Sequence, residues 1–172
     1  MNPTRSLRLR SLPLAPVCAL ALLAASARAQ NCTGSISANV SQVSISTGGV
    51  QNITLDVAPG QAGLPWQIVG AYGTNHPIPW LAYGNLRLNN DRYLYRTYSG
   101  HRGFLQGVVP GYIGGPLVPF NSQGQAQVQV VIPPGLPSIF IGRTLHHGMY
   151  RISPDTLLPE CGTGTVPLTL VP

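Results

Sequence analysis

Charged residues are scarce in this chain of 172 residues: they make up 8% of it, and lysine is absent. Helical bundles and coiled coils need long segments rich in glutamate and lysine, so the composition excludes both. The 20 glycines and 17 prolines would also interrupt such segments. Intrinsic disorder is excluded as well, because 44% hydrophobic residues with little charge is the opposite of the disordered signature.

No apolar run is long enough for a retained membrane anchor. Residues 1–29 contain a basic start, an apolar stretch over 12–25 and the small-residue sequence Ala27-Arg28-Ala29. This order is typical of a cleaved signal peptide, and the stretch is shorter than the roughly 20 residues of a membrane-spanning helix. The sequence therefore predicts a signal peptide over 1–29 and one domain over 30–172. We expect a secreted protein, extracellular or at the periplasm or cell surface, without membrane association after cleavage.

The predicted mature chain has little net charge. Four of the ten arginines lie in the signal segment, which leaves six arginines against four acidic residues, a net charge of +2. Proteins that bind nucleic acids usually carry a dense stripe of lysine and arginine that displaces counterions from phosphates. We therefore expect no nucleic-acid partner.

Cysteine is also rare. Removal of the signal peptide removes Cys18 and leaves Cys32 and Cys161. An even number of cysteines in an exported chain indicates a disulfide, so we predict a single bond between these two residues.

Alternating apolar and polar residues recur along the mature chain. The candidate strands are 35–46, 50–57, 66–72, 81–88, 92–99, 104–109, 125–132, 143–152 and 163–171. A one-residue slip between Val40 and Val43 predicts a bulge or kink in the first of them. In 125–132 the alternation places Val128 in the core and Gln129 in solvent. Eight or nine short strands separated by turn residues predict an all-β, immunoglobulin-like antiparallel β-sandwich.

Several segments carry a resemblance to known proteins. They are "ITLDVAPGQAGLPWQIVGAYGT", "VPFNSQGQAQVQVVIPPGLP", "GRTLHHGMY" and the terminal "VPLTLVP". Together they resemble a group of uncharacterised bacterial secreted β-sandwich modules, over most of 35–172. The resemblance implies export and an immunoglobulin-like sandwich. It implies no activity, and no functional residue is carried over from it.

Motifs of common catalytic sites are missing. No Gly-x-Ser-x-Gly sequence, typical of a hydrolase nucleophile, occurs. The four acidic residues, Asp56, Asp91, Asp155 and Glu160, are isolated from one another, unlike the acids of calcium loops. A glycosidase carboxylate pair would need two of them to meet in space. We therefore expect no catalysis and no cofactor.

The dipeptide His146-His147 is a weak candidate for a metal site. Neighbouring side chains on a strand point to opposite faces, so the two imidazoles cannot chelate one metal. A site would require His76 or His101 from loops. We favour packed or hydrogen-bonded strand histidines, and we expect no metal.

Residues 87–104 combine tyrosine with four of the six remaining arginines. Aromatic rings stack on sugars and guanidinium groups bind acidic groups, so this segment is a candidate ligand surface. The residues proposed for it are Trp80, Arg92, Tyr93, Tyr95, Arg96, Tyr98 and Arg102. We favour a structural strand over 92–99, in which Tyr93 and Tyr95 are buried and Arg96 faces solvent.

The favoured function is a secreted, non-catalytic structural or interaction module whose partner is an unknown protein or a polysaccharide at the cell surface. A carbohydrate-binding module that uses the Tyr/Arg surface is the alternative. A hydrolase with a site built from loops is a third, less favoured hypothesis.

Overall fold

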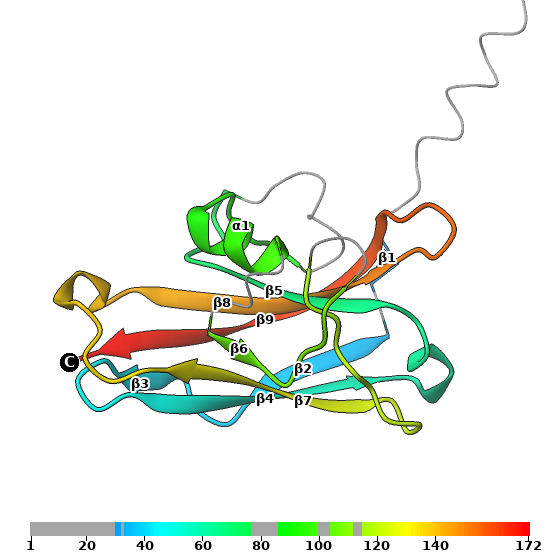
Figure 1. Ribbon diagram of the computed structural model, residues 1–172. Helices are drawn as coiled ribbons and strands as arrows, with labels where there is room; N and C mark the ends of the chain where they lie inside the picture. The colour runs from blue at the N-terminus through cyan, green and yellow to red at the C-terminus, as the bar shows by residue number, and fades with distance from the viewer. Residues whose placement is uncertain (1–29, 32, 77–85, 100–103, 112–114) are drawn as a thin grey trace, which may run out of the picture.

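Two stacked β-sheets form the protein (Figure 1). The computed structural model describes residues 30–31, 33–76, 86–99, 104–111 and 115–172. The strands are β1 (Gln30–Asn31), β2 (Gly34–Ala38), β3 (Gln42–Ser44), β4 (Gly49–Val57), β5 (Trp66–Ala71), β6 (Leu105–Gln106), β7 (Gln125–Ile132), β8 (Thr144–Ile152) and β9 (Pro159–Val171). The helical elements are the 3-10 turn η1 (Pro59–Gln61), the helix α1 (Arg92–Tyr98) and the 3-10 turn η3 (Ser138–Phe140).

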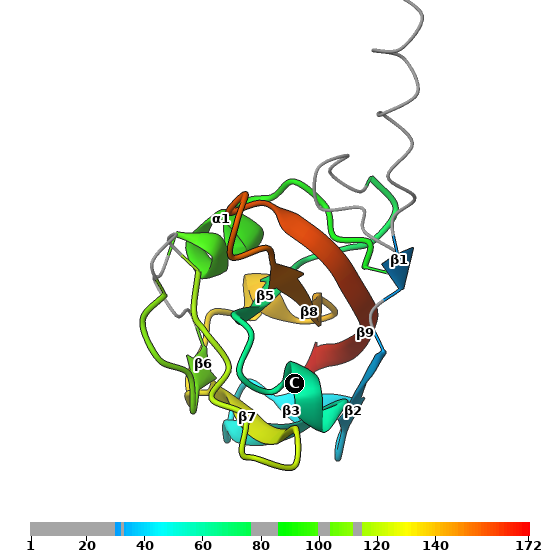
Figure 2. The same cartoon turned by 90° about the vertical axis from the view of Figure 1, so that its right-hand side faces the viewer.

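The two sheets differ in the order of their strands. One has the order β1-β9-β8-β5, and β3 also pairs with β9; the other has the order β2-β4-β7-β6. Figure 2 shows the two layers from one end of the molecule. The predicted all-β sandwich is confirmed. The expected antiparallel arrangement holds except at β1 and β3, which both run parallel to β9.

The core lies between the sheets and follows the predicted alternation. In β7, Val128 and Val130 are fully buried while Gln127 and Gln129 are exposed. In β4, the inward positions are Gln51, Ile53, Leu55 and Val57. Side chains two residues apart share a face of a strand, so apolar residues at alternate positions specify which face is buried.

The slip in 35–46 is a kink at which the chain changes sheet, and no bulge interrupts the pairing of β2 with β4. The chain leaves β2 in one sheet and enters β3 in the other. The buried amide of Gln51 stabilises this crossover, because its Nε2 donates to the carbonyl oxygens of Val40 at 2.6 Å and Pro167 at 2.9 Å. The two acceptors satisfy the buried donor group of this amide, whereas its Oε1 has no hydrogen-bond partner among the described residues.

The predicted strand 92–99 is the helix α1, and the strand prediction was wrong. Residues 116–118 pair with the start of the outer edge of β5, and the helix packs along the rest of it, where Thr97 Oγ1 accepts a hydrogen bond from the Gly70 N–H at 3.0 Å. An exposed sheet edge is prone to unwanted pairing, and the helix covers it. Among the described residues no helix is both long and apolar enough to cross a bilayer.

Other predicted strands are shorter than expected or fall outside the described ranges. Of 81–88, only 86–88 are described; they form no strand, but Leu86 and Leu88 are buried in a small second core that also contains Leu94 of α1. Of 104–109, only β6 is a strand. Between β7 and β8 the chain forms the turn η3.

The predicted disulfide involves one residue, Cys32, outside the described ranges, so it stays a prediction. Cys161 is buried in β9. The register of β1 places Gln30 opposite Cys161 and Asn31 opposite Gly162.

Candidate binding site

Asp91 attaches α1 to the sandwich. Its Oδ1 accepts hydrogen bonds from the backbone N–H groups of Tyr93 and Leu94, both at 2.9 Å. Its Oδ2 accepts one from the N–H of Tyr72 at 2.7 Å, immediately beyond β5. A carboxylate is a favourable N-cap because it satisfies free N–H groups and meets the positive end of the helix dipole. One side chain therefore starts the helix and joins it to the end of β5.

The helix separates its side chains into two sets. The buried set is Tyr93, Leu94 and Thr97, and the exposed set is Arg92, Tyr95 and Arg96. Tyr95 is 71% exposed, so the expectation that it would be buried together with Tyr93 was wrong. Residues two apart share a face of a strand but not of a helix.

A cavity of about 370 Å³ opens beside this helix. Its described walls combine four aromatic rings with two guanidinium groups: Tyr72, Tyr93, Phe104, Phe140, Arg92 and Arg96. The Tyr93 ring lies between two others, with centroids 5.4 Å from Tyr72 and 6.1 Å from Phe104. We call this cavity the helix-end pocket. Its aromatic surfaces suit stacking against a ring, and its cations suit an acidic group.

The wall formed by Tyr93 is held from behind by His147. The Tyr93 hydroxyl and His147 Nε2 share a hydrogen bond of 2.8 Å, and both side chains are buried. Burial raises the pKa of Tyr93 and lowers the pKa of His147 to about 3. Both groups are therefore neutral at neutral pH.

Gly70 makes room for this contact. A Cβ at this position would lie 2.5 Å from Tyr93 Cε1 and 2.7 Å from His147 Cδ2, far inside van der Waals contact. The absence of a side chain on β5 therefore allows the tyrosine ring and the imidazole to meet.

Two arginines of the site form no ion pair with a described residue. Among the described residues the one ion pair joins Arg151 to Glu160 at 2.8 Å, so Arg92 and Arg96 have no acidic partner there. The carboxylate of Asp91 is already bound to backbone N–H groups.

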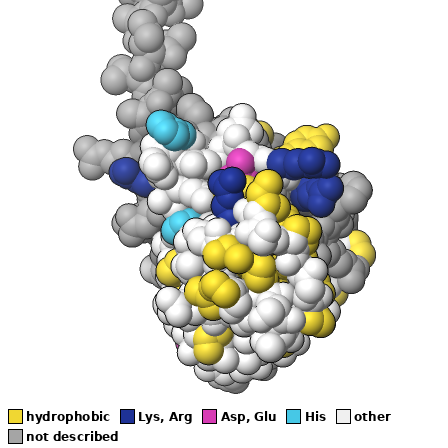
Figure 3. Space-filling model, turned by 90° about the vertical axis from the view of Figure 1, so that its left-hand side faces the viewer, with side chains coloured by type: hydrophobic (Ala, Val, Ile, Leu, Met, Phe, Trp, Pro, Cys, Tyr) yellow, Lys and Arg dark blue, Asp and Glu magenta, His cyan; other side chains and the backbone are white. Residues whose placement is uncertain are grey.

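Arg143, which is exposed at the start of β8, adds to this charge. Burial, and then the charge of Asp91, raise the pKa of Tyr72. Arg96, Arg143 and Arg92 act on the same hydroxyl in the opposite direction. Arg143 lies close to the pocket, because its backbone N–H donates to the carbonyl oxygen of the pocket residue Phe140 at 3.0 Å. Figure 3 shows arginine and hydrophobic side chains adjacent to one another on this end of the molecule.

The structure brings together only part of the predicted ligand surface. Arg92, Tyr93 and Arg96 line the helix-end pocket, and Tyr95 lies on the exposed face of the same helix. Tyr98 is half-buried and packs against the second core. Trp80 and Arg102 lie outside the described residues.

Three contributors were missed in the sequence: Tyr72, Phe140 and Arg143. Phe104 ends the candidate segment 87–104 and also lines the pocket. These residues come from separate segments that only the fold brings together. The helix itself had a usable signal, because Asp91 directly before Arg92 is a typical N-cap. Phe140 follows a proline-rich turn and carries no comparable signal.

The two strand histidines point to opposite faces, as the alternation predicted. His147 is fully buried, and His146 is half-buried with its pKa lowered by burial. In the part of the chain that the structure describes, no three His, Cys, Asp or Glu side chains gather as metal ligands would. His101 lies outside that part.

A second cavity, of about 420 Å³, lies at the opposite end of the sandwich. Its described walls, such as Trp66, Phe120 and Leu157, carry no charge. Its buried amide, Gln67, is already occupied: Nε2 donates to the Gly115 carbonyl at 3.2 Å, and the Tyr150 hydroxyl donates to Oε1.

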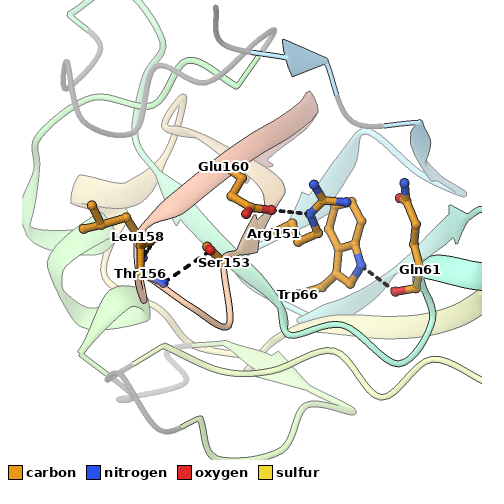
Figure 4. A network of polar contacts seen from close by, with 7 residues as sticks. All are labelled: Gln61, Trp66, Arg151, Ser153, Thr156, Leu158 and Glu160. Atoms are coloured by element: carbon orange, nitrogen blue, oxygen red, sulfur yellow. Dashed lines mark hydrogen bonds and ion pairs between the residues drawn. The ribbon is translucent and has the colours of Figure 1, made fainter. Parts of the chain in front are cut away.

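The neighbouring polar contacts at this end are also internal, as Figure 4 shows. Trp66 Nε1 donates to the Gln61 carbonyl at 3.1 Å, and Arg151 pairs with Glu160. The described walls of this cavity carry no charge, whereas those of the helix-end pocket include two arginines that form no ion pair with a described residue.

Comparisons with known proteins identify no family for this chain. No protein-family profile and no curated protein matches it. Among solved structures, the reeler domain of human F-spondin is similar over 89% of this chain and 99% of that one, with 12% identity and a TM-score of 0.39. A similarity this low carries no functional inference.

Proposed function

We propose that this protein is an exported, non-catalytic module that binds an acidic saccharide in the helix-end pocket. The observation that carries the proposal is a cavity walled by four aromatic rings and flanked by Arg92, Arg96 and Arg143, none of which has an acidic partner among the described residues. This proposal makes specific the interaction role that the sequence suggested.

The chemistry of the walls favours a ring that carries an acidic group. Aromatic faces take up the apolar face of a sugar, and guanidinium groups form charge-assisted hydrogen bonds to carboxylate or sulfate. A volume of about 370 Å³ falls within the range of small-ligand sites, about 300–1,000 Å³. A neutral sugar would leave the arginine charge uncompensated.

The described walls support binding rather than turnover. They contain no carboxylate, and the nearest one, Asp91, is occupied by three N–H donors. Tyr93 and His147 are buried and neutral, and their polar atoms face each other. General acid–base catalysis needs a group that can exchange a proton with the substrate near the working pH.

Export and the disulfide belong to the same proposal. The segment 1–29 has the order of a signal peptide, and β1 runs beside Cys161 so that the chain reaches Cys32 one residue after Asn31. A bond there would join the start of the mature chain to β9. Its loop would span well over 100 residues, for which the chain-entropy estimate is about 4–5 kcal/mol.

Calorimetric titration of the mature protein tests the binding proposal. We expect oligomers of galacturonic acid or sulfated saccharides to bind and neutral glucan oligomers of equal length to bind at least tenfold more weakly. The double variant Arg92→Ala/Arg96→Ala should lose tenfold or more in affinity for the acidic ligand, since each charge-assisted bond contributes roughly 1–2 kcal/mol at a partly exposed site.

Arg87→Ala is the matched control, because Arg87 is exposed but does not line the pocket. Its affinity should stay within twofold of the parent protein. Equal binding of neutral and acidic oligomers, or equal losses in the control and the double variant, would refute the proposal.

A further inference from the structure

A rigid apolar loop projects beside the helix-end pocket. It connects β7 to β8, and its outward side chains Ile139 and Ile141 are 72% and 44% exposed. The loop is held from within: the Ile141 N–H donates to the Ser138 carbonyl at 2.9 Å, and the Gly142 N–H donates to the Leu170 carbonyl at 2.8 Å. The isoleucines are therefore exposed by an ordered turn.

Phe140, between the two isoleucines, turns the opposite way. It packs against the core and forms part of the pocket wall. The loop is thus anchored by its middle residue and presents its two neighbours to the outside. Water contact with a large aliphatic side chain is unfavourable, so an exposed pair on one turn is a candidate interaction surface. Leu157 and Leu158, in the turn between β8 and β9, form a second such pair, 56% and 62% exposed. The charge around each pair distinguishes them.

Positive charge surrounds this tip. Arg143 follows the loop directly, and the exposed face of α1 contributes Arg92 and Arg96, with Tyr95 between them. Figure 3 shows this face, with hydrophobic side chains in the same region as arginines. Each side-chain type suits one layer of a lipid surface: isoleucine suits the acyl chains, tyrosine the headgroup boundary and arginine the phosphates.

We infer that this end of the sandwich docks on an anionic lipid bilayer, with Ile139 and Ile141 entering the acyl boundary and Arg92, Arg96 and Arg143 contacting lipid phosphates. Tyr95 would lie at the headgroup level, where amphipathic rings are favoured. Three arginines without acidic partners among the described residues complement the phosphates of an anionic surface, and the two exposed isoleucines favour a bilayer over a soluble acidic polymer. The sequence alone led to the opposite expectation, of no membrane association after signal cleavage.

The far end of the molecule provides a contrast. Leu158, in the turn between β8 and β9, is 62% exposed, but the nearby Arg151 is paired with Glu160. Figure 1 shows this turn at the end of the sandwich away from the β7–β8 loop. An exposed aliphatic residue without free positive charge is a matched control for Ile139.

Co-sedimentation of the mature protein with vesicles tests the inference. We expect binding to vesicles of phosphatidylcholine mixed with phosphatidylglycerol, and at least tenfold weaker binding to phosphatidylcholine alone. Ile139→Ser should reduce binding about tenfold, as expected for the loss of one inserted aliphatic side chain. Arg143→Ala should reduce it about fivefold. Leu158→Ser should leave it within twofold.

Thermal melts of the serine variants should match the parent protein, since both side chains are exposed. Absence of binding to anionic vesicles, or equal losses in Ile139→Ser and Leu158→Ser, would overturn the inference. The inference does not require the saccharide. Ile139→Ser should retain affinity for acidic oligomers, so failure of vesicle binding and failure of the proposed function are distinguishable.

Discussion

Acidification should destabilise this protein through His147. The side chain is fully buried against Tyr93, and its Nδ1 has no hydrogen-bond partner among the described residues. Burial, and to a lesser extent His146, lower its pKa from 6.5 to about 3. An imidazolium ion would place an unpaired charge in the core, so the folded state keeps the ring neutral.

The sign of the effect follows from proton binding. Between the folded pKa of about 3 and the unfolded value of 6.5, the unfolded chain binds one more proton than the folded chain. The contribution of the neutral His147 to the free energy of unfolding is therefore fully present above pH 6.5 and decreases as the pH falls towards 3. Each pH unit changes the free energy of unfolding by about 1.4 kcal/mol, so lowering the pH from 6.5 to 4.5 should cost roughly 2–3 kcal/mol.

Urea unfolding at a series of pH values, followed by tryptophan fluorescence, measures this effect. His147→Gln removes the titrating group, and its stability should change much less between pH 6.5 and 4.5 than that of the parent protein. His76→Gln is the matched control, because the His76 side chain is exposed, and it should keep the parent slope. If His147→Gln retains the full acid dependence, His147 is not the group responsible and the reasoning fails.

Three further predictions concern the same region and are checked by thermal or urea melts. Gly70→Ala should destabilise by roughly 1–3 kcal/mol, because its Cβ would overlap Tyr93; an unchanged melt would contradict the packing. Asp91→Ala should cost about 1–2 kcal/mol through the lost cap, and Asp91→Asn should recover part of it. Tyr95→Ala should cost less than about 0.5 kcal/mol, since this ring is 71% exposed; a loss of 3 kcal/mol would indicate a buried ring.

The long strands were predictable because their information is local. Alternate apolar residues in 125–132 allow one register in which Gln127 and Gln129 reach water, and β7 has that register. The same logic held for β4 and for the opposite orientations of His146 and His147. Wherever one face of a strand must be buried, the period of two determines the orientation of every side chain.

Helix α1 was not predictable in this way. Its seven residues, RYLYRTY, contain tyrosine and threonine, which favour strands, and cover too few turns to display a helical period. Tertiary contacts favour the helix: Asp91 binds its first N–H groups and Thr97 binds the edge of β5. The binding role suggested for Arg92 and Arg96 is compatible with a strand or a helix. The burial predicted for Tyr95 is not compatible with the helix, in which this ring is 71% exposed.

The class of fold, the buried faces of the long strands and the low net charge follow from the amino-acid sequence alone, because composition and alternation act over a few neighbouring residues. The crossing of 35–46 between sheets, and the shared pocket of Tyr72, Tyr93, Phe104 and Phe140, emerge only in the folded chain. These residues come from segments far apart in the chain, and their meeting depends on the pairing of β5 with β8 and on the space left at Gly70. Such contacts depend on three-dimensional packing, which the alternation of apolar and polar residues along the sequence does not predict.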